Sequence, residues 1–148
     1  MLRITKIFHF KMAHAICGYP GSCKNVHGHS YELHVTVAAE RHNDYFIPSP
    51  GFITDFKVLK QLVQACIVQP LDHKLLLSNA YMDSNPSITR EENLIVWETE
   101  PTLENLLIYM QRCISKKLDE GTHLVALKLF ETKDSYAEWN CEHAYSRN

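Results

Sequence analysis

The segment that decides the fold is His27-Gly28-His29-Ser30-Tyr31-Glu32-Leu33-His34-Val35-Thr36-Val37, because two classes of side chain alternate along it. One set consists of His27, His29, Tyr31, Leu33, Val35 and Val37. The other set consists of Ser30, Glu32, His34 and Thr36. Successive side chains of a strand project to opposite faces, so the alternation predicts a long strand over residues 27–40 with one solvated side.

A second strand is indicated on the N-terminal side of this segment. Residues 4–16 alternate imperfectly and place Phe8, Phe10, Met12 and His14 on one face. A loop rich in turn residues, Cys17–Asn25, separates the two strands. The spacing allows the strands to pair as a hairpin.

The rest of the chain reads as helices and shorter strands. A short strand is expected over 51–54, followed by a helix that Asp55 caps and Pro70 ends. Residues 78–92 are polar and read as irregular, and 93–97 as a short strand. A second helix begins at Pro101-Thr102, and the last long strand covers 124–132 with Glu131 on its apolar face. These elements predict an α+β fold, an antiparallel sheet with two helices packed on one face.

Length and composition narrow the class of protein. The 148 residues fit one domain over 1–148, and 45% hydrophobic and 22% charged residues are ordinary for a globular protein. A net charge of −2 without a basic stripe gives no sign of a nucleic-acid partner, and no apolar run is long enough to cross a membrane. Five cysteines, an odd number without framework spacing, indicate reduced thiols and a cytoplasmic location.

Three of the nine histidines form a candidate metal site. His27 and His29 lie two residues apart on a strand and therefore face the same way. His14 ends the preceding strand and would lie opposite them in a hairpin. Three imidazoles with a fourth position left for water or substrate make a catalytic metal site. The alternative is that His-Gly-His is a strand junction whose histidines are unrelated.

Several motifs in order resemble the 6-pyruvoyl-tetrahydropterin synthase and 6-carboxytetrahydropterin synthase family. They are Phe10-Lys11-Met12-Ala13-His14, Cys23-Lys24-Asn25-Val26-His27-Gly28-His29, Pro70-Leu71-Asp72-His73, Pro101-Thr102-Leu103-Glu104-Asn105 and Glu131-Thr132. The resemblance spans about residues 4 to 140. It implies the tunnelling fold (T-fold) and a homohexamer built as a dimer of trimers, with active sites between subunits.

The resemblance also implies roles for individual residues. It implies that catalytic zinc (Zn2+) is held by His14, His27 and His29. It further implies a catalytic relay of Cys23, Asp72 and His73, and substrate contacts by Glu131, Thr102 and Glu104. Taken alone, Glu131 could be a strand-end charge facing solvent and Asp72-His73 a helix C-terminal turn. Thr102 and Glu104 could equally be helix N-terminal residues that stabilise the dipole.

Within the family, the carboxy-forming branch is favoured. Three residues separate Cys23 from His-Gly-His, and Thr54-Asp55-Phe56 also resembles that branch. The implied activity is a zinc-dependent lyase that converts 7,8-dihydroneopterin triphosphate to 6-carboxytetrahydropterin, in queuosine biosynthesis. The alternatives are a 6-pyruvoyl-tetrahydropterin synthase acting on the same substrate, and a non-catalytic pterin- or metal-binding protein.

Overall fold

Strands β1 (Ile4–His14) and β2 (His27–Ala39) form the centre of the sheet, as their alternation predicts. The computed structural model describes residues 2–39 and 45–141. The two strands pair antiparallel without interruption from Ile4 opposite Val37 to His14 opposite His27. Their apolar faces are buried together, with Phe10 3% and Leu33 0% exposed.

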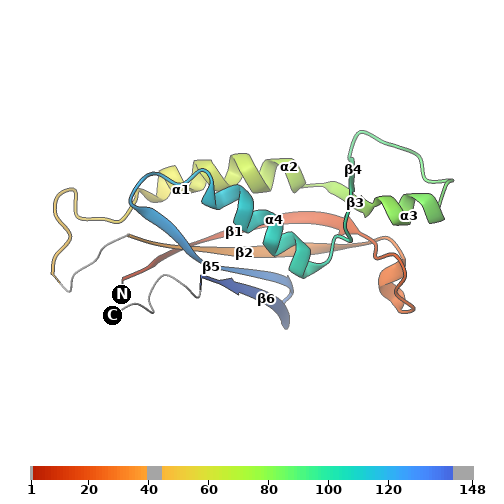
Figure 1. Cartoon of the computed structure of the whole chain (residues 1–148), viewed down its shortest axis with the longest axis horizontal. Helices are drawn as coiled ribbons and strands as arrows, with labels where there is room; N and C mark the ends of the chain where they lie inside the picture. The colour runs from red at the N-terminus through yellow and green to blue at the C-terminus, as the bar shows by residue number, and fades with distance from the viewer. Residues whose placement is uncertain (1, 40–44, 142–148) are drawn as a thin grey trace.

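Four further strands extend this pair into a mixed sheet with the order β4-β3-β1-β2-β5-β6. Strand β5 (Thr122–Thr132) pairs antiparallel with β2, and β6 (Ser135–Asn140) with β5. Strands β3 (Lys74–Ser78) and β4 (Leu94–Trp97) pair in parallel on the other side of β1. The α+β class is confirmed, but the sheet is not wholly antiparallel. The helix after β2 returns the chain in the direction of β1, and β3 continues that way (Figure 1).

Two helical segments cover one face of the sheet (Figure 1). The first runs from α1 (Phe56–Val63) through a π-helical stretch (Gln64–Val68) into α2 (Gln69–Leu71). Asp55 caps it as predicted, since its side chain accepts a hydrogen bond from the Lys57 N–H at 2.8 Å. The second is α4 (Leu103–Ser115), which buries Leu106, Leu107, Met110 and Ile114. No helix among residues 2–39 and 45–141 is long and apolar enough to cross a membrane.

Three local expectations were wrong. Residues 52–54 form bends instead of a strand. The segment 78–92 is not irregular throughout, because α3 (Asn79–Ser84) begins at Ser78, whose hydroxyl accepts the Tyr81 N–H at 3.0 Å. Strands β3 and β6 were not expected. The run Lys-Leu-Leu-Leu-Ser of β3 has no period-2 pattern, since both faces of a parallel strand can be covered.

Glu100 ties three elements together where the sheet meets α4. Its carboxylate accepts a hydrogen bond from the Ser78 hydroxyl at 2.6 Å and another from the Cys17 N–H at 2.9 Å. Its backbone carbonyl accepts the side-chain N–H of Asn105, in the first turn of α4, at 2.9 Å. Ser78 is only 1% exposed, so its hydroxyl depends on this partner. Glu100 therefore fixes the end of β3 and the loop after β1 against the start of α4.

We expect Glu100→Ala to lower the free energy of unfolding by about 1–3 kcal/mol, because the buried Ser78 hydroxyl and the Cys17 N–H lose a charged acceptor. Urea unfolding followed by circular dichroism at fixed protein concentration measures this loss. Glu98→Ala, which removes an exposed carboxylate two residues away, is the matched control and should change stability by less than about 0.5 kcal/mol. Equal stability of the two variants would contradict this role of Glu100.

Candidate metal centre and active site

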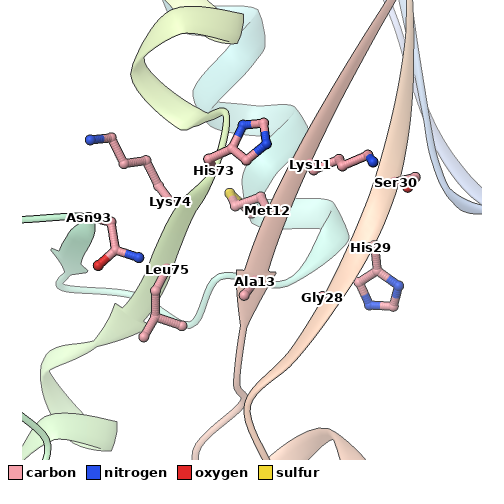
Figure 2. A pocket seen from close by; sticks show the side chains of 10 residues that line it. All are labelled: Lys11, Met12, Ala13, Gly28, His29, Ser30, His73, Lys74, Leu75 and Asn93. Carbon is pink, nitrogen blue, oxygen red and sulfur yellow. The ribbon is translucent and has the colours of Figure 1, made fainter.

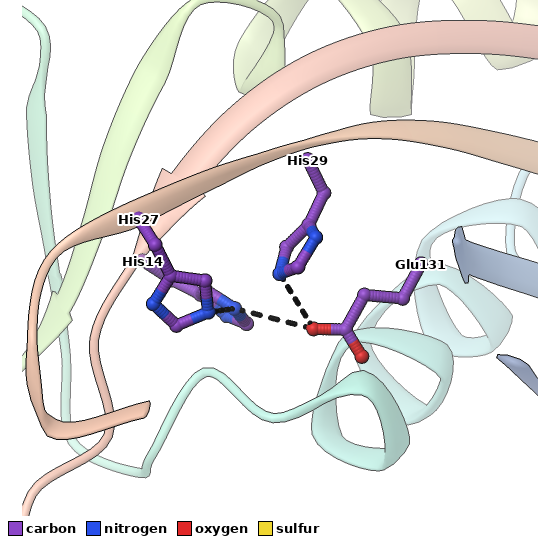
Figure 3. A group of neighbouring side chains, drawn as sticks. All are labelled: His14, His27, His29 and Glu131. Carbon is purple, nitrogen blue, oxygen red and sulfur yellow. Dashed lines mark hydrogen bonds and ion pairs between the residues drawn. The ribbon is translucent and has the colours of Figure 1, made fainter. Parts of the chain in front are cut away.

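The β1–β2 register brings three histidines and one glutamate to the end of the sheet (Figure 3). His14 lies directly opposite His27, and His29 projects from the same face of β2. The Nε2 atoms of His14 and His27 are 3.1 Å apart. Glu131 enters from β5, with its Oε1 atom 2.7 Å from His29 Nε2 and 3.4 Å from His14 Nε2. All four potential ligand atoms lie within 4.8 Å of one another.

Strand alternation brings Glu131 to this cluster, because it has the same parity on β5 as the buried Leu127 and Leu129. A β-bulge falls at the same position, since the β5–β6 register shifts between Phe130 and Thr132. The β2–β5 ladder also ends there, at the pair Glu32–Phe130. The sequence predicts the apolar face on which Glu131 lies, but it contains no signal for the bulge.

Two backbone carbonyls set the orientation of the imidazoles. His14 Nδ1 lies 2.8 Å from the Pro101 carbonyl oxygen, and His27 Nδ1 lies 2.7 Å from that of Asn25. A carbonyl oxygen only accepts, so each Nδ1 must carry the hydrogen. In the neutral form, the Nε2 lone pairs of both rings then point into the cluster. Nδ1–H bonds of this kind are the usual outer partners of metal-binding histidines.

Burial favours the neutral form of His14 and His29. It lowers the pKa of His14 below its ordinary value, against the opposing effect of the hydrogen bond to Pro101. Burial likewise lowers the pKa of His29, with the carboxylate of Glu131 acting in the opposite direction. Both histidines therefore tend to be uncharged near pH 7, the state in which an imidazole can bind a metal.

The cluster fits a tetrahedral metal ion. Bonds of ~2.0–2.1 Å put neighbouring ligands of a tetrahedral centre roughly 3.3–3.4 Å apart. The separations of 3.1 Å between His14 and His27 and of 3.4 Å between His14 and Glu131 are close to that value, whereas the 2.7 Å between His29 and Glu131 is shorter. The buried His29 Nε2 has no hydrogen bond of acceptable geometry among the described residues, although Glu131 is close. Facing lone pairs repel one another unless a cation or a proton lies between them, so the donor set suits zinc.

The residues of the expected relay are separated within one chain. Cys23 lies in a 3₁₀ turn (Ser22–Lys24), and its carbonyl accepts the Ile16 N–H at 2.8 Å. Asp72 accepts the Lys11 N–H at 2.9 Å, and the His73 N–H donates to the Lys11 carbonyl at 2.6 Å. Lys11 lies within β1, whereas Ile16 lies two residues beyond its end, so the two parts of the relay are anchored at different places. Cys23 makes no hydrogen bond to Asp72 or His73 in the parts of the chain described.

Asp72 and His73 do form a pair with each other. His73 Nδ1 lies 2.9 Å from Asp72 Oδ2, and His73 adopts a left-handed backbone conformation with φ 59°. The Lys11 backbone N–H, together with the bond from His73, lowers the pKa of Asp72. Asp72 is therefore ionised at neutral pH and orients a largely exposed imidazole. The helix-terminal turn considered from sequence is also present, since α2 ends at Leu71.

The start of α4 lies beside the histidine cluster. Thr102 caps this helix by accepting the Asn105 N–H at 3.2 Å, and Glu104 is an exposed residue of its first turn. Both residues thus lie at the N-terminus of the helix, the structural role considered from sequence. They are close to the Pro101 carbonyl that orients His14. Sequence reasoning missed Glu100, which holds this junction. The acidic residue before Pro101-Thr102 carries no signal of its contacts to Ser78 and Cys17.

Comparison with known proteins places these residues in a family context. Residues 3–142 match the family model described as 6-pyruvoyl tetrahydropterin synthase. A relative from Rickettsia typhi named 6-carboxy-5,6,7,8-tetrahydropterin synthase is 29% identical, covering 93% of this chain and 99% of that protein. A relative from Pongo abelii named 6-pyruvoyl tetrahydrobiopterin synthase is 32% identical, covering 82% of this chain and 72% of that protein.

The fold agrees with this relationship. The structure of Caenorhabditis elegans 6-pyruvoyl tetrahydropterin synthase superposes with a TM-score of 0.68 at 19% identity, covering 95% of both chains. The family-model match extends over almost the whole chain and includes all four residues of the His14–Glu131 cluster. The chain therefore belongs to the 6-pyruvoyl tetrahydropterin synthase family.

Proposed function

We propose that this protein is a 6-carboxy-5,6,7,8-tetrahydropterin synthase, a zinc-dependent lyase. It converts 7,8-dihydroneopterin triphosphate and water to 6-carboxytetrahydropterin, acetaldehyde and triphosphate, a step toward queuosine. The observation that carries the proposal is the convergence of three imidazole Nε2 atoms in a family of pterin enzymes. Relatives with this name match over nearly their full length, for example 99% of the proteins from Rickettsia typhi and Haemophilus influenzae.

In this proposal His14, His27 and His29 hold the zinc. Bound there, zinc would act as a Lewis acid on the side-chain hydroxyls of the substrate and make the neighbouring C–H more acidic. Cys23 is the base that removes the proton. A free thiol is only slightly ionised at pH 7, so it needs an activating partner. The Asp72–His73 pair has the geometry for that task, since the carboxylate orients the imidazole and stabilises its charged form.

In this proposal the relay forms between copies of the chain. Cys23 is bonded to Ile16, beyond the end of β1, whereas the Asp72–His73 pair is bonded to Lys11 within β1, and no hydrogen bond joins them in the described part of the chain. A second copy that brings its His73 to this chain's Cys23 would complete the relay. We therefore propose a homohexamer, a dimer of trimers, in which each 148-residue chain is one domain. Five free cysteines support a cytoplasmic location.

Glu131, Thr102 and Glu104 are proposed to contact the pterin. A carboxylate can accept two parallel N–H bonds from the amino-pyrimidinone edge of a pterin. Glu131 has a second candidate role, because its Oε1 lies 2.7 Å from His29 Nε2 and could complete the metal coordination. The two roles make different demands on Glu131. Metal binding needs one oxygen, whereas the pterin contact needs both oxygens as acceptors.

The alternative within the family is a 6-pyruvoyl-tetrahydropterin synthase, favoured by the 32% identity to the relative from Pongo abelii. Incubation with 7,8-dihydroneopterin triphosphate, with the pterin product identified by mass, separates the two. We expect 6-carboxytetrahydropterin together with acetaldehyde. A 6-pyruvoyl product without acetaldehyde would favour the alternative, and an unchanged substrate would favour a non-catalytic binding protein.

Zinc content distinguishes the two roles of Glu131. We expect one zinc per chain in the purified protein, measured by elemental analysis, and loss of zinc in His29→Ala. Glu131→Gln should keep zinc but bind pterin roughly 10–100-fold more weakly, since its amide NH2 replaces one of the two acceptor oxygens that the pterin contact needs. His34→Ala is the control, because His34 contacts Glu32 instead of the cluster. Zinc loss in Glu131→Gln would instead assign Glu131 to the metal.

Cys23→Ala should retain zinc and the fold yet lose most turnover. Cys17→Ala should stay close to wild type, because the only hydrogen bond of the Cys17 sulfur among the described residues is the long one with the Ser84 hydroxyl, at 3.9 Å. The backbone N–H of Cys17, which bonds Glu100, survives this substitution. Steady-state turnover and zinc content of both variants test the assignment. An inactive Cys17→Ala beside an active Cys23→Ala would overturn the relay.

A further inference from the structure

A cavity of about 390 Å³ lies on the sheet face from which Lys11 and Ser30 project (Figure 2). Its lining comes from β1, β2, the start of β3 and the residue before β4. The polar or charged side chains of this lining are those of Lys11, Ser30, His73, Lys74 and Asn93, whereas His29 borders the cavity but its ring projects from the other face of β2. Gly28 and Ala13, which are paired across the two central strands, form a flat part of its floor.

The cavity carries positive charge that no carboxylate neutralises. Neither the Lys11 nor the Lys74 ammonium forms an ion pair in the described part of the chain. The nearby Asp72 is already engaged by the Lys11 backbone N–H at 2.9 Å and by His73 Nδ1 at 2.9 Å. Ser30 and Asn93 add neutral hydrogen-bond donors. Two unpaired ammonium groups with further N–H and O–H donors match the chemistry of an anion with many oxygen atoms.

The strand register decides which copy of the active site this cavity can serve. Lys11 and Ser30 are paired across the strands and project away from the helices. His14 and His29 have the opposite parity in the same strands and project toward the helix side. The sheet therefore lies between the cavity and the histidine cluster of the same chain. A substrate bound at that cluster cannot place its phosphates in this cavity by crossing the sheet.

We propose that the cavity binds the triphosphate group of a substrate whose pterin is held at the metal centre of a neighbouring copy. The inference rests on the proposed function for the identity of the substrate. It also explains the position of His73, which lines the cavity and would stand beside the neighbour's Cys23. Lys11 and Lys74 would then hold the charged tail of the substrate while the metal centre holds the opposite end.

Binding of inorganic triphosphate tests the anion site without any turnover. We expect the wild-type protein to bind it in isothermal titration calorimetry, with affinity that falls as salt rises. The double variant Lys11→Ala/Lys74→Ala should bind roughly tenfold or more weakly, while its affinity for neopterin, which lacks phosphates, stays unchanged. Lys57→Ala/Lys60→Ala removes two exposed lysines of α1 and is the matched control. Equal triphosphate affinity in both double variants would overturn the site.

Mixed assemblies test the neighbouring-copy arrangement. Chains carrying Lys11→Ala/Lys74→Ala keep the histidine cluster, and His29→Ala chains keep the cavity. If the cavity serves a neighbour, co-assembled and doubly tagged hexamers should regain substrate affinity and turnover above the average of the two parents. Activity no higher than that average, or an active monomer, would overturn the arrangement. The wild-type protein could also be inactive on the substrate while it binds triphosphate and the lysine variant does not. That outcome would reject the proposed lyase and retain the anion site.

Discussion

The antiparallel register of β1 and β2 is the constraint on which the candidate site depends. It sets His14 directly opposite His27 and puts His29 on the same face. A slip of one residue would turn one strand's histidines to the far side of the sheet and break the cluster. Burial of the alternating apolar residues on that face opposes such a slip, because Tyr31 and Leu33, 1% and 0% exposed, would enter solvent. The core thus maintains the site geometry.

The rigidity of the cluster comes from backbone groups that the β1–β2 hairpin and α4 supply. The Asn25 carbonyl precedes β2, and the Pro101 carbonyl precedes α4, so two separate parts of the chain orient one pair of rings. Glu100 holds the second of these carbonyls in place through Ser78 and Cys17. Carbonyl acceptors at Nδ1 leave both Nε2 atoms free for a metal ion.

The two faces of the sheet carry different parts of the proposed chemistry. The helix side holds the histidines and Glu131, whereas the open side holds the cavity with Lys11 and Lys74. The Asp72–His73 pair is hydrogen-bonded to the Lys11 backbone and therefore belongs with the open side. In the proposed mechanism one copy supplies the metal centre and a neighbouring copy supplies the cavity and the Asp72–His73 pair, so assembly of several copies is part of that proposal.

Sequence alone determined the central strands, the two long helices and the three candidate metal histidines, because period-2 and helical patterns are local consequences of burial. The Asp55 cap followed in the same way from local hydrogen bonding. Only the tertiary structure decided the parallel pairing of β3 and β4, since strand direction depends on where a helix returns the chain. The approach of Glu131 to the three histidines and the separation of Cys23 from His73 were likewise decided by contacts between segments far apart in sequence. Such contacts leave no periodic signal, because each depends on the packing of a whole layer instead of on neighbouring residues.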